Sequence, residues 1–325
     1  MKKNLLTIAS ALALGLALSP IAHAQDKPVY GVLLKTLSNP FWDAMAKGIA
    51  EGAKESDVTI FQEAAQSDQD AETQLNLCNT MLERKPAALI ASAINSSNLL
   101  PCMKTANEQG IPVVDLDANL DPKITAKAGV KIAFSIGSDN LHAGAKAADF
   151  MAKHLGAQAS GPVLVIEGLP GNVTGEERAQ GFKDELAKAA PGLKVVASLP
   201  GDWDANKAAN ITNDIMQRSP NLVAIFAAND TMALGAVESV YAAGKGGKIT
   251  VVGVDGSVDG VKSIKAGRLT ATVAQLPYLE AIEAIANVKK VIAGQSVPSV
   301  IHVPTLVLTK QVLAAGTNPD LKYVK

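Results

Sequence analysis

The feature of this 325-residue sequence that most constrains its fold is the alternation of short apolar runs with amphipathic segments. The first apolar run, residues 29–34, precedes an amphipathic segment, and the same order continues to about residue 155. The alternation begins again at Gly161-Pro162 and continues through most of the second half. Strands that alternate with helices are typical of parallel sheets with helices on both faces. The sequence therefore predicts an α/β fold with doubly wound parallel sheets.

The two halves of the sequence contain a weak internal repeat. Residues 87–118 and 222–256 follow one plan: an apolar run, a loop with an asparagine, an amphipathic segment, a glycine and an apolar run that ends in aspartate. This plan makes Asp117 equivalent to Asp255. A repeat of about half the chain predicts two similar lobes rather than a solenoid of short units. Loops at the carboxyl edges of two facing sheets would meet at a cleft, a favoured position for a ligand.

Residues 35–42, Lys-Thr-Leu-Ser-Asn-Pro-Phe-Trp, form the predicted loop between the first strand and the first helix. We expect that helix at Asp43–Glu55, with Pro40 suited to its first turn and Ser38 or Asn39 as the cap. The loop holds two aromatic residues although the whole chain is only 4% aromatic. Rings to stack on and polar groups to bind hydroxyls suit a polar ligand with apolar ring faces. A helix cap beside two core aromatics is the alternative.

Polar and aromatic side chains recur in the loops that follow the predicted strands. Carboxylates and amides offer paired hydrogen-bonding groups to adjacent hydroxyls, and aromatic faces cover the C–H faces of a pyranose. For each polar residue alone a helix cap or a turn is the alternative, but the set predicts a site for a neutral sugar. The predicted ligand-binding residues are Lys35, Asn39, Phe41, Trp42, Asp117, Asn172, Glu176, Trp203, Asn229, Asp255 and Gln275.

Catalysis and nucleic-acid binding find little support in the sequence. It contains no G-x-S-x-G, H-E-x-x-H or G-x-x-x-x-G-K-[ST] motif, and its four histidines are scattered without metal-ligand spacing. Asp117 and Asp255 could act as a carboxylate pair on a glycoside, but we expect them on opposite lobes. With a net charge of −1 and no basic patch, nucleic-acid binding is not expected. We predict a binding protein that is not an enzyme and uses no metal or cofactor.

The N-terminus has the pattern of a secretory signal peptide. Two lysines precede an apolar run from Leu5 to Leu18, and Ala22-His-Ala24 resembles a cleavage site. We therefore expect residues 1–24 to be removed and the mature chain to begin near Gln25. No cysteine follows this site, so a lipid anchor is not expected, and no later run approaches ~20 apolar residues. The protein is predicted to be exported and soluble, with a retained N-terminal anchor as the alternative.

The chain has only two cysteines, Cys78 and Cys102. Export makes a disulfide permissible. Cys78 lies in a predicted helix, Asp68–Arg84, and Cys102 lies near the start of the next helix. Because consecutive helices of a doubly wound sheet often share a face, a bridge is feasible. Two buried thiols are the alternative.

Six short motifs resemble those of a known family: SNPFW, VVDLDA, GDWD, FAANDTMALGA, VVGVDG and ATVAQLP. Together they resemble the periplasmic sugar-binding proteins of the ribose type, which serve ABC importers, and the likeness covers essentially the whole mature chain. It implies a periplasmic protein with two lobes, of the type I periplasmic binding protein fold, that close on a monosaccharide like a hinge. The implied partners are the sugar and an inner-membrane permease. A chemotaxis receptor is a compatible further partner, and a monomer is expected.

The resemblance also implies that the chain crosses between the lobes three times. These crossings map near Gly137, Gln275 and Pro304. The predicted N-terminal lobe then comprises residues 25–137 and 276–304, and the C-terminal lobe comprises residues 138–275 and 305–325. We expect residues 300–308 to close the fold as one extended segment.

The residues that match the family's sugar contacts are Asn39, Phe41, Trp42, Asp117, Trp203, Asn229, Asp255 and Gln275. The resemblance implies that a ribose binder would have a small serine-like residue in place of Lys35, an arginine in place of Ala118 and another arginine near Glu176. The lysine and the glutamate in this sequence look like the allose-binding branch of the family.

The resemblance therefore favours an aldohexose such as D-allose, or the related ketose D-psicose, with D-ribose as the alternative sugar. An exported sugar-processing enzyme is a rival of a different class. A sugar-responsive repressor shares the two-lobed core, but it would need a basic helix-turn-helix where this chain has its predicted signal peptide.

Overall fold

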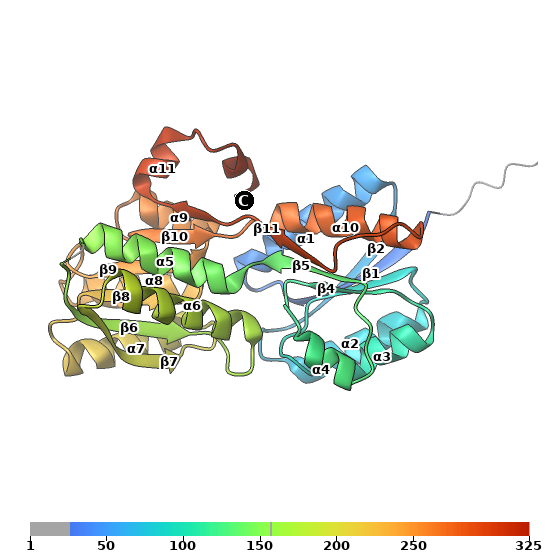
Figure 1. Cartoon of the computed structure of the whole chain (residues 1–325), viewed down its shortest axis with the longest axis horizontal. Coiled ribbons are helices and arrows are strands. Elements are labelled where there is room, and N and C mark those ends of the chain that lie inside the picture. The colour runs from blue at the N-terminus through green and yellow to red at the C-terminus, as the bar shows by residue number, and fades with distance from the viewer. Residues whose placement is uncertain (1–26, 157, 325) are drawn as a thin grey trace, which may run out of the picture.

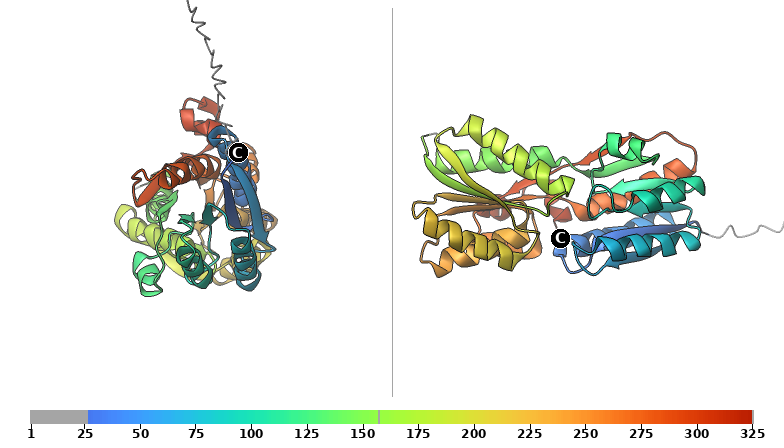
Figure 2. Two further views of the ribbon diagram at one scale, coloured as in Figure 1. Left: turned by 90° about the vertical axis from the view of Figure 1, so that its right-hand side faces the viewer. Right: turned by 90° about the horizontal axis from the view of Figure 1, so that it is seen from below.

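The computed structural model describes residues 27–156 and 158–324, which form two lobes side by side (Figure 1). Each lobe contains a six-stranded sheet, with strand order β11-β5-β4-β3-β1-β2 in the first and β12-β10-β9-β8-β6-β7 in the second. Neighbouring strands are parallel except for β12, which is antiparallel to β10. Helices cover both faces of each sheet (Figure 2). The predicted α/β fold with two similar lobes is confirmed.

The first lobe contains the beginning of the described chain and one later segment, with α10 and β11, that returns to it. Its strands are β1 (Val29–Thr36), β2 (Thr59–Ala65), β3 (Ala88–Ala91), β4 (Val113–Leu116), β5 (Phe134–Ser138) and β11 (Val300–Val303). Its helices are α1 (Pro40–Ser56), α2 (Ala71–Glu83), α3 (Leu100–Glu108), α4 (Pro122–Lys127) and α10 (Pro277–Ile292). One hydrophobic core lies under α1 and α10, and another lies under α2 and α3 on the opposite face.

The second lobe repeats this arrangement. Its strands are β6 (Gly161–Glu167), β7 (Leu193–Pro200), β8 (Ala224–Ala227), β9 (Thr250–Asp255), β10 (Ala271–Ala274) and β12 (Leu306–Leu308). Its helices are α5 (Asn140–Leu155), α6 (Val173–Ala189), α7 (Ala205–Arg218), α8 (Asp230–Ala242), α9 (Val258–Lys265) and α11 (Lys310–Ala315). A 3₁₀ turn, Pro319–Tyr323, then packs against α10 of the first lobe. The inner strands β8, β9 and β10 are fully buried because helices cover both of their faces.

Two predicted boundaries were wrong. Helix α1 begins at Pro40 rather than at Asp43, because the Asn39 side chain accepts a hydrogen bond from the Phe41 N–H and caps the helix there. Phe41 and Trp42 therefore lie in the first helical turn and not in the loop. Helix α2 begins at Ala71 rather than at Asp68, because the Asp70 side chain accepts a hydrogen bond from the Thr73 N–H and caps the helix there. The extended segment expected at residues 300–308 consists of β11 and β12, which lie in different sheets.

The chain passes between the two sheets at three places. These lie after β5, after β10, and between β11 and β12. The crossing after β10 reaches the pocket described below, because Gln275 lines it. A rotation of one lobe against the other would bend the chain at the crossings. The domain limits given by the sequence analysis stay a prediction.

Helices α5 and α6 are in backbone contact, and glycine makes this contact possible. A Cβ atom on Gly144 would lie 2.0 Å from the Arg178 carbonyl oxygen, and one on Gly181 would lie 1.9 Å from the Leu141 carbonyl oxygen. Any larger residue would separate the two helices. The close crossing fixes the position of α6, and with it the side chain of Arg178 at the edge of the lobe.

No helix in residues 27–156 and 158–324 is both long enough and apolar enough to span a membrane. The predicted signal peptide lies outside the described residues.

The two cysteines form a disulfide between α2 and α3, with 6.2 Å between the Cα atoms of Cys78 and Cys102. Of the two alternatives left open by the sequence, the structure therefore contains the bridge. The bond joins residues separated by 24 positions, and both side chains are buried in the core under α2 and α3.

Reduction of this disulfide should destabilise the first lobe. Closure of a loop of this length limits the conformations of the unfolded chain, so we expect reductant to lower the free energy of unfolding by about 3 kcal/mol. Urea denaturation with and without reductant measures the difference. The double variant Cys78→Ala/Cys102→Ala should not respond to reductant, and an equal response of both proteins would contradict a contribution from the bridge.

Candidate functional site

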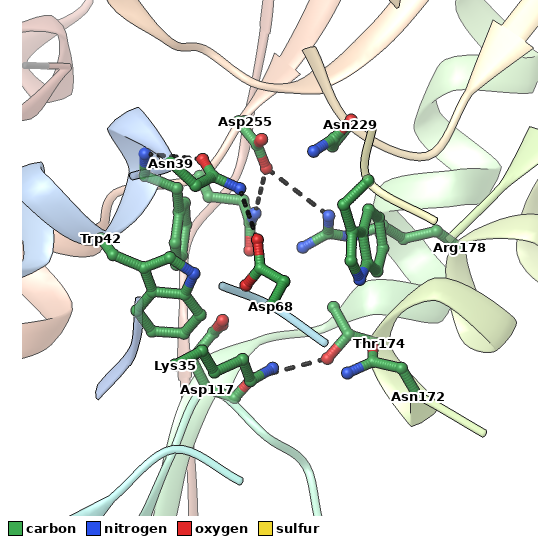
Figure 3. A pocket seen from close by; sticks show the side chains of 13 residues that line it. Lys35, Asn39, Trp42, Asp68, Asp117, Asn172, Thr174, Arg178, Asn229 and Asp255 are labelled. Atoms are coloured by element: carbon green, nitrogen blue, oxygen red, sulfur yellow. Dashed lines mark hydrogen bonds and ion pairs between the residues drawn. The ribbon is translucent and has the colours of Figure 1, made fainter. Parts of the chain in front are cut away.

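A pocket lies where the carboxyl edges of the two sheets face each other (Figure 3). Its empty volume, counted together with the solvent at its open side, is about 340 Å³. Both lobes contribute polar and aromatic side chains. The lining residues are Lys35, Asn39, Phe41, Trp42, Asp68, Asp117, Asn172, Thr174, Arg178, Trp203, Asn229, Asp255 and Gln275. The size and composition suit one small polar molecule.

The two lobes touch each other around this pocket. The Asn172 side-chain N–H donates to the Ile94 carbonyl oxygen at 2.8 Å, and the Thr174 hydroxyl donates to the Asp117 carbonyl oxygen at 3.5 Å. A third contact joins the Gln69 amide to the Asp202 carbonyl oxygen at 3.4 Å. These hydrogen bonds connect strand-end loops of one lobe to those of the other. The structure is therefore a closed form in which the pocket is largely shielded from solvent.

The first lobe supplies an aromatic wall and a buried lysine. The rings of Phe41 and Trp42 meet edge to face, with 4.9 Å between their centroids. The Lys35 Nζ lies 5.2 Å from the centre of the Trp42 ring, and the lysine is only 5% exposed. Within the described residues, its ammonium group has no hydrogen-bond acceptor or carboxylate within bonding distance. A buried cation without a partner is costly, so its donors are available to a ligand.

The second lobe supplies a buried arginine. The Arg178 guanidinium donates to the side-chain oxygen of Asn140 at 2.8 Å and to the Ala228 carbonyl oxygen at 2.9 Å. It also lies 3.5 Å from a carboxylate oxygen of Asp255. The same oxygen accepts a 2.7 Å hydrogen bond from the Gln275 amide, which belongs to the crossing after β10. The pocket and one interlobe crossing are thus joined by direct hydrogen bonds.

Burial changes the acid–base properties of these groups. It raises the pKa of Asp255 to about 8 although Arg178 acts in the opposite direction, and it raises the pKa of Asp117 against the effects of Lys35 and Arg178. Burial also lowers the pKa of Lys35. The charged forms are disfavoured in an empty closed pocket because they have lost water. Hydroxyl groups that bind them would restore the lost hydrogen bonds.

The balance of charges around the pocket favours an uncharged ligand. Two cationic side chains, Lys35 and Arg178, face three carboxyl groups, those of Asp68, Asp117 and Asp255. A hydroxyl can donate to a carboxylate and accept from a cation, so a polyol can bind every one of these groups. No group of three or more potential metal ligands occurs in the described part of the chain.

All of the predicted site residues except Glu176 line the pocket. Glu176 is exposed, and its carboxylate accepts a hydrogen bond from the Gly171 N–H at 3.1 Å, at the start of its own helix. Glu176 therefore does not line the pocket, and Arg178, two residues along the same helix, lines it instead.

Asn172 and Asn229 each cap a helix and also line the pocket. Each side-chain oxygen caps a helix, accepting from Gly175 N–H at 3.2 Å and from Met232 N–H at 2.9 Å respectively. Both residues nevertheless line the pocket. Helix N-termini thus hold these amides at the pocket edge.

The sequence analysis missed Asp68, Thr174 and Arg178. Asp68 follows β2 and could have been found by the rule used for the other strand ends. Thr174 and Arg178 lie inside α6, on either side of the predicted Glu176, and the sequence does not show which of these side chains face the cleft. Only the packing of α6 on α5 brings Arg178 to the pocket.

A second layer of acidic groups lies beneath the pocket. Glu280, in the first turn of α10, is fully buried, and neither of its carboxyl oxygens has a hydrogen-bond partner among the described residues. Burial, followed by the nearby Asp117 and Asp115, raises its pKa well above the ordinary value. The pKa of Asp115 itself is raised to about 6 by burial. The buried surroundings of Glu280 therefore favour its protonated, neutral form.

A family model described as "Periplasmic binding protein domain" matches residues 30–296. The chain belongs to this family. The D-allose-binding periplasmic protein of Escherichia coli is 41% identical over 268 residues, which cover 82% of this chain and 85% of that protein. The ribose import binding protein of Haemophilus influenzae is 34% identical over 95% of this chain and 100% of that protein.

Solved structures of other members of the periplasmic binding protein family have the same fold. An ABC transporter periplasmic solute-binding protein from Actinobacillus succinogenes, solved with bound D-allose, superposes with a TM-score of 0.83 at 36% identity. The match covers 88% of this chain and 98% of that chain. A solute-binding protein from Agrobacterium vitis, solved with tagatopyranose, has a TM-score of 0.83 at 29% identity over 91% of this chain and 98% of that one.

The buried Glu280 should make the stability of this periplasmic binding protein depend on pH. Above the ordinary pKa of glutamate the unfolded chain loses this proton while the folded chain keeps it, so Glu280 lowers stability as pH rises. We expect Glu280→Gln to become more stable than the wild type by a margin that grows from pH 5 to pH 8, as measured by urea denaturation.

Glu283→Gln, on the same helix, is the matched control and should follow the pH profile of the wild type. A constant difference between Glu280→Gln and the wild type at every pH would show that Glu280 titrates normally.

Proposed function

We propose that this chain is an exported solute-binding protein that captures one neutral monosaccharide between its lobes and delivers it to an ABC importer. The observation that carries the proposal is the pocket itself. It is closed, small and nearly balanced in charge, and it combines an aromatic wall with buried carboxyl, amide and cationic groups from both lobes. This combination suits hydroxyl groups on an apolar ring.

In the proposed binding mode, the carboxylates of Asp117 and Asp255 accept hydrogen bonds from sugar hydroxyls. Lys35, Arg178 and the amides of Asn39, Asn172, Asn229 and Gln275 supply further hydrogen bonds. The rings of Phe41, Trp42 and Trp203 cover the C–H faces of the sugar. Charged hydrogen bonds in a shielded pocket are short and strong, so each contact contributes to both affinity and selectivity.

Ligand-dependent closure follows from the cost of the empty closed pocket. Without a ligand, closure removes water from Lys35, Asp117 and Asp255 and provides few hydrogen bonds to replace it. A sugar that bonds to both lobes compensates this cost only in the closed form, so it shifts the population toward closure. The hydrogen bond from Gln275 to Asp255 connects this event to an interlobe crossing.

D-Allose is the sugar that we favour, with D-psicose as a related ketose and D-ribose as the alternative. One relative is described as a D-allose-binding protein, and one similar structure was solved with bound D-allose. Lys35 supports a hexose, because a lysine with three donors in the aromatic wall can bind a hydroxyl that a pentose lacks.

We also propose where the protein acts and which proteins it contacts. The chain acts in the periplasm after removal of residues 1–24, as a monomer, and its partner is an inner-membrane permease that recognises the closed form. Presentation of the sugar to a chemotaxis receptor is compatible with this role. We propose a binding role without enzymatic activity, because the relatives are described as sugar-binding proteins.

A panel of pentoses and hexoses tests the sugar class. We expect thermal shift and calorimetry on the purified protein to give the strongest response with D-allose or D-psicose. A large response to D-ribose and none to D-allose would overturn the hexose assignment and leave the transport role intact. The sugar recovered after incubation should be chemically unchanged by NMR, whereas a new product would support the enzyme alternative.

Loss of either strand-end aspartate should weaken sugar binding strongly. Asp117→Ala or Asp255→Ala removes a buried carboxyl group that the sugar hydroxyls would bind, and we expect a cost of roughly 2–5 kcal/mol in binding free energy by calorimetry. Asp43→Ala is the control, because Asp43 is exposed in the first turn of α1 and pairs with Lys47. Unchanged affinity in either pocket variant would show that the aspartate does not bind the sugar.

A further inference from the structure

Asp68 lines the pocket beside Lys35 and Trp42 (Figure 3). It lies in the loop between β2 and α2. Its carboxylate accepts a hydrogen bond from the Asn39 amide at 3.4 Å and faces the indole of Trp42 (Figure 3). Both residues come from the beginning of α1, so Asp68 joins the loop after β2 to the turn that carries the aromatic wall.

A purely local role for Asp68 does not account for these contacts. The N-cap of the following helix, α2, is Asp70, whose side chain accepts a hydrogen bond from the Thr73 N–H at 3.2 Å. Asp68 is therefore not needed as a cap. Its carboxylate instead faces the pocket side of the loop, where the partners are residues of the proposed sugar site.

The contact between Asp68 and Trp42 restricts the orientation of the indole ring. The indole N–H is the single hydrogen-bond donor of tryptophan, and the Asp68 carboxylate lies on that side of the ring (Figure 3). The ring also meets Phe41 at an interplanar angle of 84°. With both contacts the face of Trp42 has a fixed direction before any sugar arrives, which lowers the entropy cost of binding.

Asp68 is also one of the charges around the Lys35 ammonium. The charged and titratable groups that act on Lys35 are Asp68 after β2, Asp115 and Asp117 at the end of β4, Glu280 on α10 and Arg178 on α6. Asp68 and Asp117 favour the charged lysine most, whereas burial and Arg178 oppose it. In the proposed binding mode Asp117 bonds to the sugar, so Asp68 remains to support the lysine.

We propose that Asp68 is a positioning residue of the sugar site, which orients Trp42 through the indole N–H and keeps Lys35 charged and ready to donate. This inference rests on the proposed function for its role in sugar binding. The orientation of Trp42 does not depend on that function, because Asp68 and Trp42 belong to the same lobe and their contact survives opening of the cleft.

Two variants separate the two parts of the role. Asp68→Asn keeps an acceptor oxygen but removes the charge, and Asp68→Ala removes both. We expect Asp68→Ala to lower the affinity for D-allose, or for whichever sugar of the panel binds the wild type, by about tenfold or more at pH 7. Asp70→Asn, two residues along the same loop, is the matched control and should bind like the wild type.

The pH profile reports on Lys35. Affinity should fall at alkaline pH as the lysine loses its proton, and Asp68→Asn should move this fall to lower pH, because a charge that favours protonated lysine is gone. In a Lys35→Met background, Asp68→Asn should no longer change the profile. An alkaline limb at the same pH in Asp68→Asn and the wild type would overturn the proposed effect on Lys35.

Tryptophan fluorescence reports on Trp42 without any sugar. The chain has two tryptophans, and both line the pocket, so Trp203→Phe leaves Trp42 as the only emitter. In that background Asp68→Ala should shift the ligand-free emission maximum, and Asp70→Asn should not. An unchanged emission in Asp68→Ala would overturn the proposal. If the wild type binds no sugar of the panel, the proposed function fails, and this emission comparison still decides the role of Asp68.

Discussion

The buried guanidinium of Arg178 is the group on which the arrangement of the pocket depends. It connects three parts of the second lobe: Asn140 at the start of α5, Ala228 after β8, and Asp255 at the end of β9. A buried arginine without these partners would be strongly unfavourable, so its neighbours are fixed with it. The backbone contact of α5 with α6 sets where this guanidinium lies. Close helix packing in one lobe thereby determines the geometry of a polar site at its edge.

Comparison with Arg178 shows which residues of the pocket could be predicted from the sequence and which could not. Residues at strand ends, such as Asp117, Asn229 and Asp255, were found because a parallel sheet brings its carboxyl ends to one edge. Arg178 was missed because its place depends on helix packing, which no motif encodes. Glu176 was wrongly preferred because residues two apart on a helix point to nearly opposite sides, and sequence alone does not say which side faces the cleft.

The burial of unpaired polar groups connects the pocket to the motion of the lobes. In the closed form the Lys35 ammonium has no hydrogen-bond partner among the described residues, and burial disfavours the charged forms of Asp117 and Asp255. A rigid protein could not keep such groups dry without a large loss of stability. Two lobes joined by three crossings avoid this loss by opening. A sugar that forms hydrogen bonds with these groups in the closed form offsets the free-energy cost of closure. The same hydrogen bonds therefore determine both the selectivity for the sugar and the closure of the lobes.

Asp117 and Asp255 are equivalent in the internal repeat, and their backbone conformation also indicates a role in the pocket. Asp117 and Asp255 both have positive φ values, 54° and 130°, although neither is glycine. Each such residue costs on the order of 1–3 kcal/mol and persists only where its surroundings determine it. Regular strands and helices require no such conformation, and each residue stands where its strand ends. Both halves of the repeat have a non-glycine residue with a positive φ at the pocket. The strain is therefore best explained by the direction that this backbone gives to the two carboxyl groups.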